Sequence, residues 1–142
     1  MGLVSDAGEF TALLERIATA WAATDADSAA ACFTAEATYM EPPDRQMFRG
    51  RDELTAYFSP LEPGTYLDIH AIWFDAHQQS GAFEFSFGVR GAPTADHGVV
   101  VVQLREGLVD TWREYHRPGP PAFDDFIEPS GKVWEWHAGN YP

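Results

Sequence analysis

The chain has 142 residues, a formal net charge of −13 at pH 7 and a single cysteine, Cys32. This length predicts one domain over residues 1–142, and ten Phe, five Tyr and five Trp can fill its core. The charge disfavours nucleic acid and anionic membranes as partners, because both are polyanions, and one cysteine excludes an internal disulfide.

The first half of the chain reads as helices with one strand. Residues 8–24 carry apolar side chains at the i, i+3, i+4, i+7 spacing of an amphipathic helix, ending at Trp21. We expect a short second helix over 28–33, a strand over 36–40 and a third helix over 50–58. The N-terminus lacks the basic start and apolar core of a signal peptide, and no apolar run approaches the ~20 residues of a membrane span. We therefore expect a cytoplasmic protein.

The second half reads as strands. Its runs of Val, aromatic and β-branched residues, joined by short connections, predict an antiparallel meander over 65–75, 81–91, 96–106 and 107–116. The stretch 118–142 is rich in proline and aromatic residues, so we expect it to pack on the body or on a partner. Helices first and an antiparallel sheet afterwards give an α+β fold.

Three stretches in this order are similar to the nuclear transport factor 2-like superfamily, in particular its SnoaL-like and ketosteroid-isomerase-like branch. They are "IATAWAATDADSAAACFTAEATYMEPP", "FRGRDELTAYF" and "VVVVQLREGLVDTWREYH". The resemblance covers a core of about residues 8–117. It implies a cone-shaped fold of three N-terminal helices packed in a strongly curved, mainly antiparallel sheet, which encloses a cavity. It also implies a homodimer through the apolar outer sheet face, which carries Val99, Val101, Thr111 and Tyr115.

The resemblance also suggests catalytic residues. A ketosteroid isomerase carries its general base at the position of Glu41, whereas its oxyanion donors fall near Ile17 and Val100, which cannot donate a hydrogen bond. Limonene-epoxide hydrolases are also similar: Tyr39 matches a tyrosine that helps to hold the attacking water, and Glu114 matches one acid of their Asp-Arg-Asp triad. The other two members of this triad fall near Phe85 and Phe87, which can do neither job. Neither family's chemistry is therefore carried over intact.

Strand alternation places Trp112, Glu114 and His116 on one face, and the resemblance puts that face inside the cone. It likewise places Phe83, Phe85, Phe87, Val100 and Val102 inward. The candidate catalytic residues are Tyr39, Glu41, Glu114 and His116. The candidate substrate-binding residues are Trp21, Phe85, Phe87, Val100 and Trp112.

Each acid also has a purely structural interpretation. Glu41 could cap the loop that follows it or pair with Arg45, Arg49 or Arg51, and Glu114 could pair with a neighbouring arginine. A metal site could be imagined from His70, His97 and His116, but nothing in their spacing demands one, so we expect no metal and no cofactor.

An apolar cavity with a few polar groups is typical of a small-molecule site. The first hypothesis is an enzyme that performs proton-transfer chemistry (isomerisation, cyclisation or dehydration) on a hydrophobic cyclic or polyketide-like molecule. The second is a non-catalytic module that binds a hydrophobic metabolite. A third is a dimerisation domain with a filled core. Substitution of Glu41 separates the first two, since only an enzyme should lose turnover.

Overall fold

The computed structural model describes residues 4–128 and contains four helices over that range. They are α1 (Ala7–Ala22), α2 (Ala26–Ala30), α3 (Gly50–Phe58) and α4 (Phe123–Ile127). The first helix begins with a capping box, because the Asp6 side chain accepts from the Glu9 backbone N–H at 2.8 Å and Glu9 reaches back. No helix in the described range is long and apolar enough to cross a membrane.

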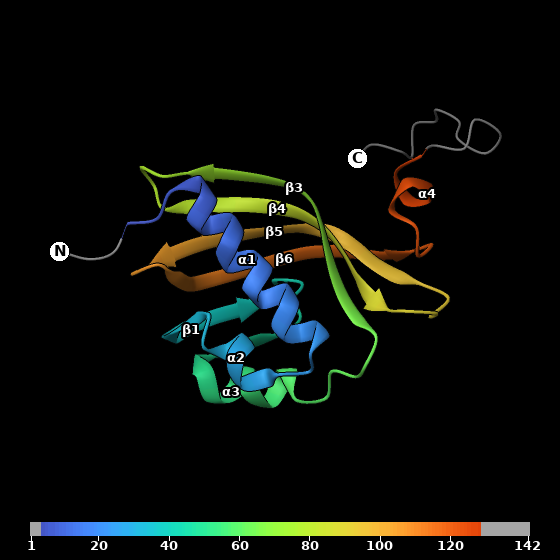
Figure 1. Ribbon diagram of the computed structural model, residues 1–142, viewed down its shortest axis with the longest axis horizontal. Coiled ribbons are helices and arrows are strands. Elements are labelled where there is room, and N and C mark those ends of the chain that lie inside the picture. The colour runs from blue at the N-terminus through green and yellow to red at the C-terminus, as the bar shows by residue number, and fades with distance from the viewer. Residues whose placement is uncertain (1–3, 129–142) are drawn as a thin grey trace.

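Within residues 4–128, six strands form one curved, mixed sheet (Figure 1). They are β1 (Phe33–Met40), β2 (Met47–Arg49), β3 (Thr65–Asp75), β4 (Ser80–Val89), β5 (Ala95–Arg105) and β6 (Leu108–Gly119). The order across the sheet is β2-β1-β6-β5-β4-β3. The β1–β6 pair is parallel and every other pair is antiparallel. The α+β class and the meander from β3 to β6 are therefore confirmed.

The second helix and the strand that follows it have other bounds than the predicted 28–33 and 36–40. The second helix ends at Ala30 instead of continuing to Phe33, because the chain turns there and Phe33 opens β1. Pairing with β6 holds this start in place, since the Val109 N–H donates to the Cys32 carbonyl at 3.0 Å. The short elements β2 and α4 were not predicted from the sequence.

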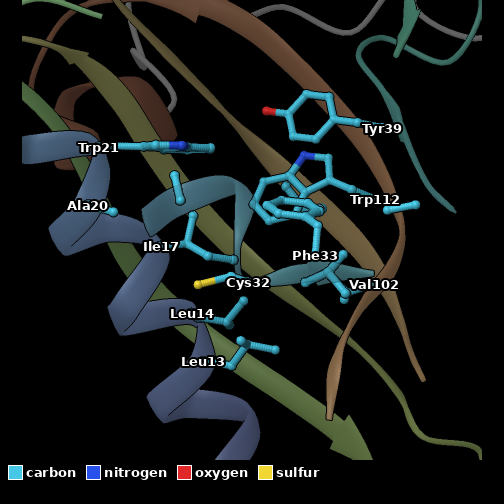
Figure 2. Close-up of a cluster of buried hydrophobic side chains, with 14 of the residues drawn as sticks. Leu13, Leu14, Ile17, Ala20, Trp21, Cys32, Phe33, Tyr39, Val102 and Trp112 are labelled. Carbon is cyan, nitrogen blue, oxygen red and sulfur yellow. The ribbon is translucent and has the colours of Figure 1, made fainter. Parts of the chain in front are cut away.

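The core lies between α1 and the concave face of the sheet (Figure 1). Phe10, Leu13, Leu14 and Ile17 on the helix are fully buried or nearly so. Figure 2 shows Leu13, Leu14 and Ile17 on the side of the helix that faces the aromatic rings of Phe33 and Trp112. The alternation expected for the strands holds, because Phe83, Phe85, Val100 and Val102 are buried on the same face.

The C-terminal segment, as far as residue 128, packs on the outer face of the sheet. Phe123 stacks on His70 with ring centroids 3.7 Å apart, and Phe126 stacks on His97 at 4.3 Å. The predicted placement of the remaining tail, 129–142, lies outside the described residues.

Candidate functional site

A cavity of about 360 Å³ opens between the helices and the concave sheet face. It is lined by side chains from α1, α3 and five strands, and by the loops after β1 and α3. Every residue predicted for the site is part of its wall: Trp21, Tyr39, Glu41, Phe85, Phe87, Val100, Trp112, Glu114 and His116. Their catalytic and binding roles remain predictions, whereas their convergence on one cavity is a feature of the structure.

The parallel pairing of β1 with β6 brings the two glutamates together. Tyr39 pairs with Trp112 across these strands, and their rings stack with centroids 5.2 Å apart and planes 11° apart. In each chain segment a glutamate follows two residues after the paired aromatic residue. Because side chains two apart on a strand share a face, Glu41 and Glu114 both enter the cavity at the same end.

Glu114 is held in place at both of its oxygens. Oε1 accepts a hydrogen bond from the Trp112 indole N–H at 3.1 Å, and Oε2 lies 2.7 Å from Nδ1 of His116. Glu114 is 7% exposed, so these bonds replace water around a buried carboxylate. The arrangement fixes its orientation toward the cavity.

Glu41 has a very different environment. The side-chain contact to its Oε1 is a long hydrogen bond of 3.4 Å from Gln46 Nε2, and Glu41 is 7% exposed. Burial, followed by the charge of Glu114, raises the pKa of Glu41 from its usual 4.5 to about 8. At neutral pH Glu41 is therefore mostly protonated and can donate a proton.

His116 and Tyr39 complete the polar end of the cavity. The hydrogen bond to Glu114 raises the pKa of His116 above its usual value, and it outweighs the opposing effect of burial. Burial, and then the charges of Glu114 and Glu41, raise the pKa of the Tyr39 hydroxyl well above 10. Tyr39 thus stays neutral and can serve as a hydrogen-bond donor.

The rest of the wall is mainly aromatic. Trp21 lies edge-on to Phe58, Phe87 and Trp112, with centroids 5.4 to 5.8 Å apart. Its indole nitrogen is the one buried side-chain N or O atom within residues 4–128 that has no hydrogen-bond partner. Figure 2 shows Trp21 and Tyr39 at the same end of the buried cluster.

Sequence reasoning missed several lining residues. Asp96 could have been found by following the alternation of β5 from Val100 back toward the start of the strand. The two residues are four apart, so their side chains share a face. Tyr57 and Phe58 lie at the C-terminal end of α3. Gln46 had no signal, because it sits in the loop between β1 and β2, and β2 itself was not expected.

One structural alternative for Glu41, an ion pair with a nearby arginine, is wrong. Within the described range, no ion pair joins Glu41 to Arg45, Arg49 or Arg51. Arg51 instead donates from Nε to the Phe33 carbonyl at 2.9 Å. The buried carboxyl at the end of β1 therefore faces the cavity without a neutralising arginine.

The three histidines considered for a metal do not form one site. His116 faces the cavity, whereas His70 and His97 lie on the outer face, each 2.7 Å from the Ser86 hydroxyl. The second nitrogen of His97 is 2.7 Å from the Pro120 carbonyl, which can only accept. With His97 donating to that carbonyl, the Ser86 hydroxyl can donate to the other His97 nitrogen and accept from His70, so each contact joins one donor to one acceptor. Among residues 4–128 no cluster of His, Cys, Asp or Glu has the arrangement of a metal site.

Comparison with known proteins adds a family. The model of the SnoaL-like domain matches residues 14–112, which is more than half of the chain. No functionally curated protein matches the sequence.

Several solved structures share the fold. The epoxide hydrolase/cyclase-like enzyme SalBIII, which has a role in pyran ring formation in the polyether salinomycin, aligns with a TM-score of 0.70 and 18% identity over 81% of this chain and 98% of its own. A putative ketosteroid isomerase from Kribbella flavida aligns with a TM-score of 0.66 and 18% identity over 87% and 90%. A cystatin-like protein of unknown function from Methylobium petroleophilum gives a TM-score of 0.68 and 18% identity over 99% of both chains.

Proposed function

The chain belongs to the SnoaL-like domain family, and we propose that it is a cofactor-independent enzyme that moves a proton on a hydrophobic, cyclic or polyketide-like small molecule. The reaction would be an isomerisation, a cyclisation or a dehydration. In this proposal the three helices α1 to α3 and the curved sheet form a cone, and its interior is the substrate site. We expect the enzyme to act in the cytoplasm.

One observation carries the proposal: two buried carboxyl groups line one cavity, and their surroundings differ. Glu41, with its pKa raised to about 8, holds a proton at neutral pH. Glu114 is oriented by Trp112 and His116 through bonds of 3.1 and 2.7 Å. Acid–base catalysis needs one group to give a proton and one to take it, and a protonated carboxyl beside an oriented second carboxyl can supply both.

The roles follow from this difference. Glu114 takes a proton from the substrate, and its hydrogen bond with His116 orients the carboxyl group that receives it. Glu41 gives its proton to a substrate oxygen on which negative charge develops, with the Tyr39 hydroxyl as a second donor. The aromatic wall excludes water and positions the apolar body of the substrate.

Deuterium exchange tests the proposal. Cyclic ketones and enones would be incubated in D₂O with wild type, with Glu41→Gln and with Glu114→Gln, and followed by mass spectrometry. The matched control is Glu36→Gln, which removes a solvent-exposed carboxyl from the same strand β1. We expect exchange with wild type and the control, and loss in either cavity variant. Absence of exchange with panel members that bind would overturn the proposal for these compounds.

A second candidate is a non-catalytic module that binds a hydrophobic metabolite. The observation that favours it is the pair of apolar residues, Ile17 and Val100, at the positions of the family's oxyanion donors; both are fully buried. For a binding module, Glu41→Gln would shift ligand affinity and no exchange would be seen with any variant.

We further propose a homodimer through the outer face of the sheet. Val99 and Val101 on β5 lie beside Tyr115, which is 49% exposed and bonded to Arg113 Nε at 3.0 Å. The introduction of a charge by Tyr115→Glu should shift the mass measured by light scattering from dimer to monomer. A monomeric wild type would contradict this part of the proposal.

A further inference from the structure

The charges around the cavity are one-sided. Three carboxyl side chains line it, from Glu41, Asp96 and Glu114. Within the described part of the chain, His116 is the only basic residue in the wall, and no lysine or arginine contributes. An anionic ligand would therefore meet carboxyl groups with no lysine or arginine to offset them, whereas a cation is attracted by each carboxyl group that is ionised.

The apolar part of the wall also suits a cation. Trp21, Tyr39, Phe85, Phe87 and Trp112 all line the cavity. The face of an aromatic ring carries negative charge density, so several rings around one space stabilise an ammonium group, more strongly once water is removed. The rings and the carboxyl groups thus favour the same sign of ligand charge for independent reasons.

We propose that the ligand of this cavity is a hydrophobic amine bound as its cation, with the positive nitrogen at the Glu41–Glu114 end and the apolar body among the rings. This inference rests on the proposed function only in taking the cavity as the ligand site. It is independent of whether any proton is moved. It narrows the ligand from any hydrophobic molecule to one with a positive charge.

Binding of such a cation is linked to the proton on Glu41. The groups around that carboxyl are Tyr39 on its own strand, Gln46 in the next loop, and Glu114 and His116 on β6, with Asp96 on β5 acting on His116. A cation beside Glu41 favours its ionised form, so binding expels the proton. Loss of the proton from His116 at higher pH removes a competing positive charge, so both groups strengthen binding as pH rises.

Two probes of the same shape test the charge directly. Phenyltrimethylammonium and tert-butylbenzene differ by one positive charge, and that charge does not titrate. Their affinities would be measured by quenching of tryptophan fluorescence at pH 6 to 9, since Trp21 and Trp112 line the cavity. We expect the ammonium compound to bind at least about tenfold more tightly than the hydrocarbon at pH 8, with its affinity falling toward pH 6.

Variants locate the effect. In Glu41→Gln the affinity of the ammonium compound should fall and lose most of its dependence on pH, while the exposed-site control Glu36→Gln should match wild type. Equal affinity of wild type for the two probes would overturn the inference yet leave the cavity as a ligand site. If neither probe binds, the inference of a cationic ligand is overturned as well. A positive deuterium-exchange result would in that case still support the proposed proton transfer.

Discussion

The buried carboxyl of Glu41 should leave a measurable mark on stability. Its pKa is raised from 4.5 to about 8 in the folded protein, so the folded state holds the proton to a higher pH than the unfolded chain does. The stability that this group contributes is therefore complete below about pH 4.5. It falls as pH rises toward 8, by up to ~1.4 kcal/mol per pH unit.

Glu41→Gln keeps the shape of the protonated side chain but cannot ionise. The free energy of unfolding would be measured by urea titration at pH 5, 6, 7 and 8. That of the variant should increase relative to that of wild type as pH rises. Over this range the difference from wild type should grow by about 3 to 4 kcal/mol. Glu36→Gln, at an exposed position of the same strand, should show no comparable trend. A difference between Glu41→Gln and wild type that is independent of pH would refute the reasoning.

Two further predictions concern the partners of the second glutamate. The pKa of His116, followed by NMR, should lie above that of an ordinary histidine. It should fall in Glu114→Gln, because the hydrogen bond to Glu114 is the largest cause of the shift. An unchanged pKa in the variant would contradict this. The stability gained from that pair is complete below the pKa of an unfolded histidine and is lost as pH rises through the raised one. Trp112→Phe should lower the free energy of unfolding by ~1 to 3 kcal/mol more than Trp21→Phe in chemical denaturation. The former removes a bond to a buried carboxylate, whereas the Trp21 N–H has no partner within residues 4–128; equal losses would argue against a structural role for the Trp112 N–H.

Local signals predicted the elements that have clear boundaries. The helix α3 and the strand β3 begin and end where expected, since Gly50 and the "SPLEPG" segment interrupt the patterns on either side. The second helix was misjudged because alanine favours helices wherever packing does not intervene. At Phe33 it does intervene, since this residue pairs with Val109 of β6.

Many of the residues that line the site could also be predicted, but the contact between its two glutamate-bearing segments could not. Alternation along each strand identified Trp112, Glu114 and His116 as one face, and the position of Glu41 followed from the family resemblance. Nothing local states that Glu41 and Glu114, far apart in sequence, occupy one end of one cavity. That depends on the register of the parallel β1–β6 pair, which only the folded sheet fixes. Once the two acids are together, burial and the charge of Glu114 raise the pKa of Glu41.

The absence of oxyanion donors at Ile17 and Val100 has a different meaning once the charges of the cavity are considered. Proton abstraction from a neutral ketone by Glu114 moves the negative charge from the carboxylate to the substrate oxygen, where Glu41 would have to neutralise it with its own proton. Abstraction beside a positively charged nitrogen, as from the α-carbon of an iminium ion, leaves a neutral enamine and the proton on the base. Such a substrate needs no oxyanion donor, and the carboxyl groups and aromatic rings that bind its charge would also orient its C–H bond. Apolar residues at the oxyanion-donor positions, in a cavity whose carboxyl groups and rings can hold a cation, are thus consistent with both proposals for this site.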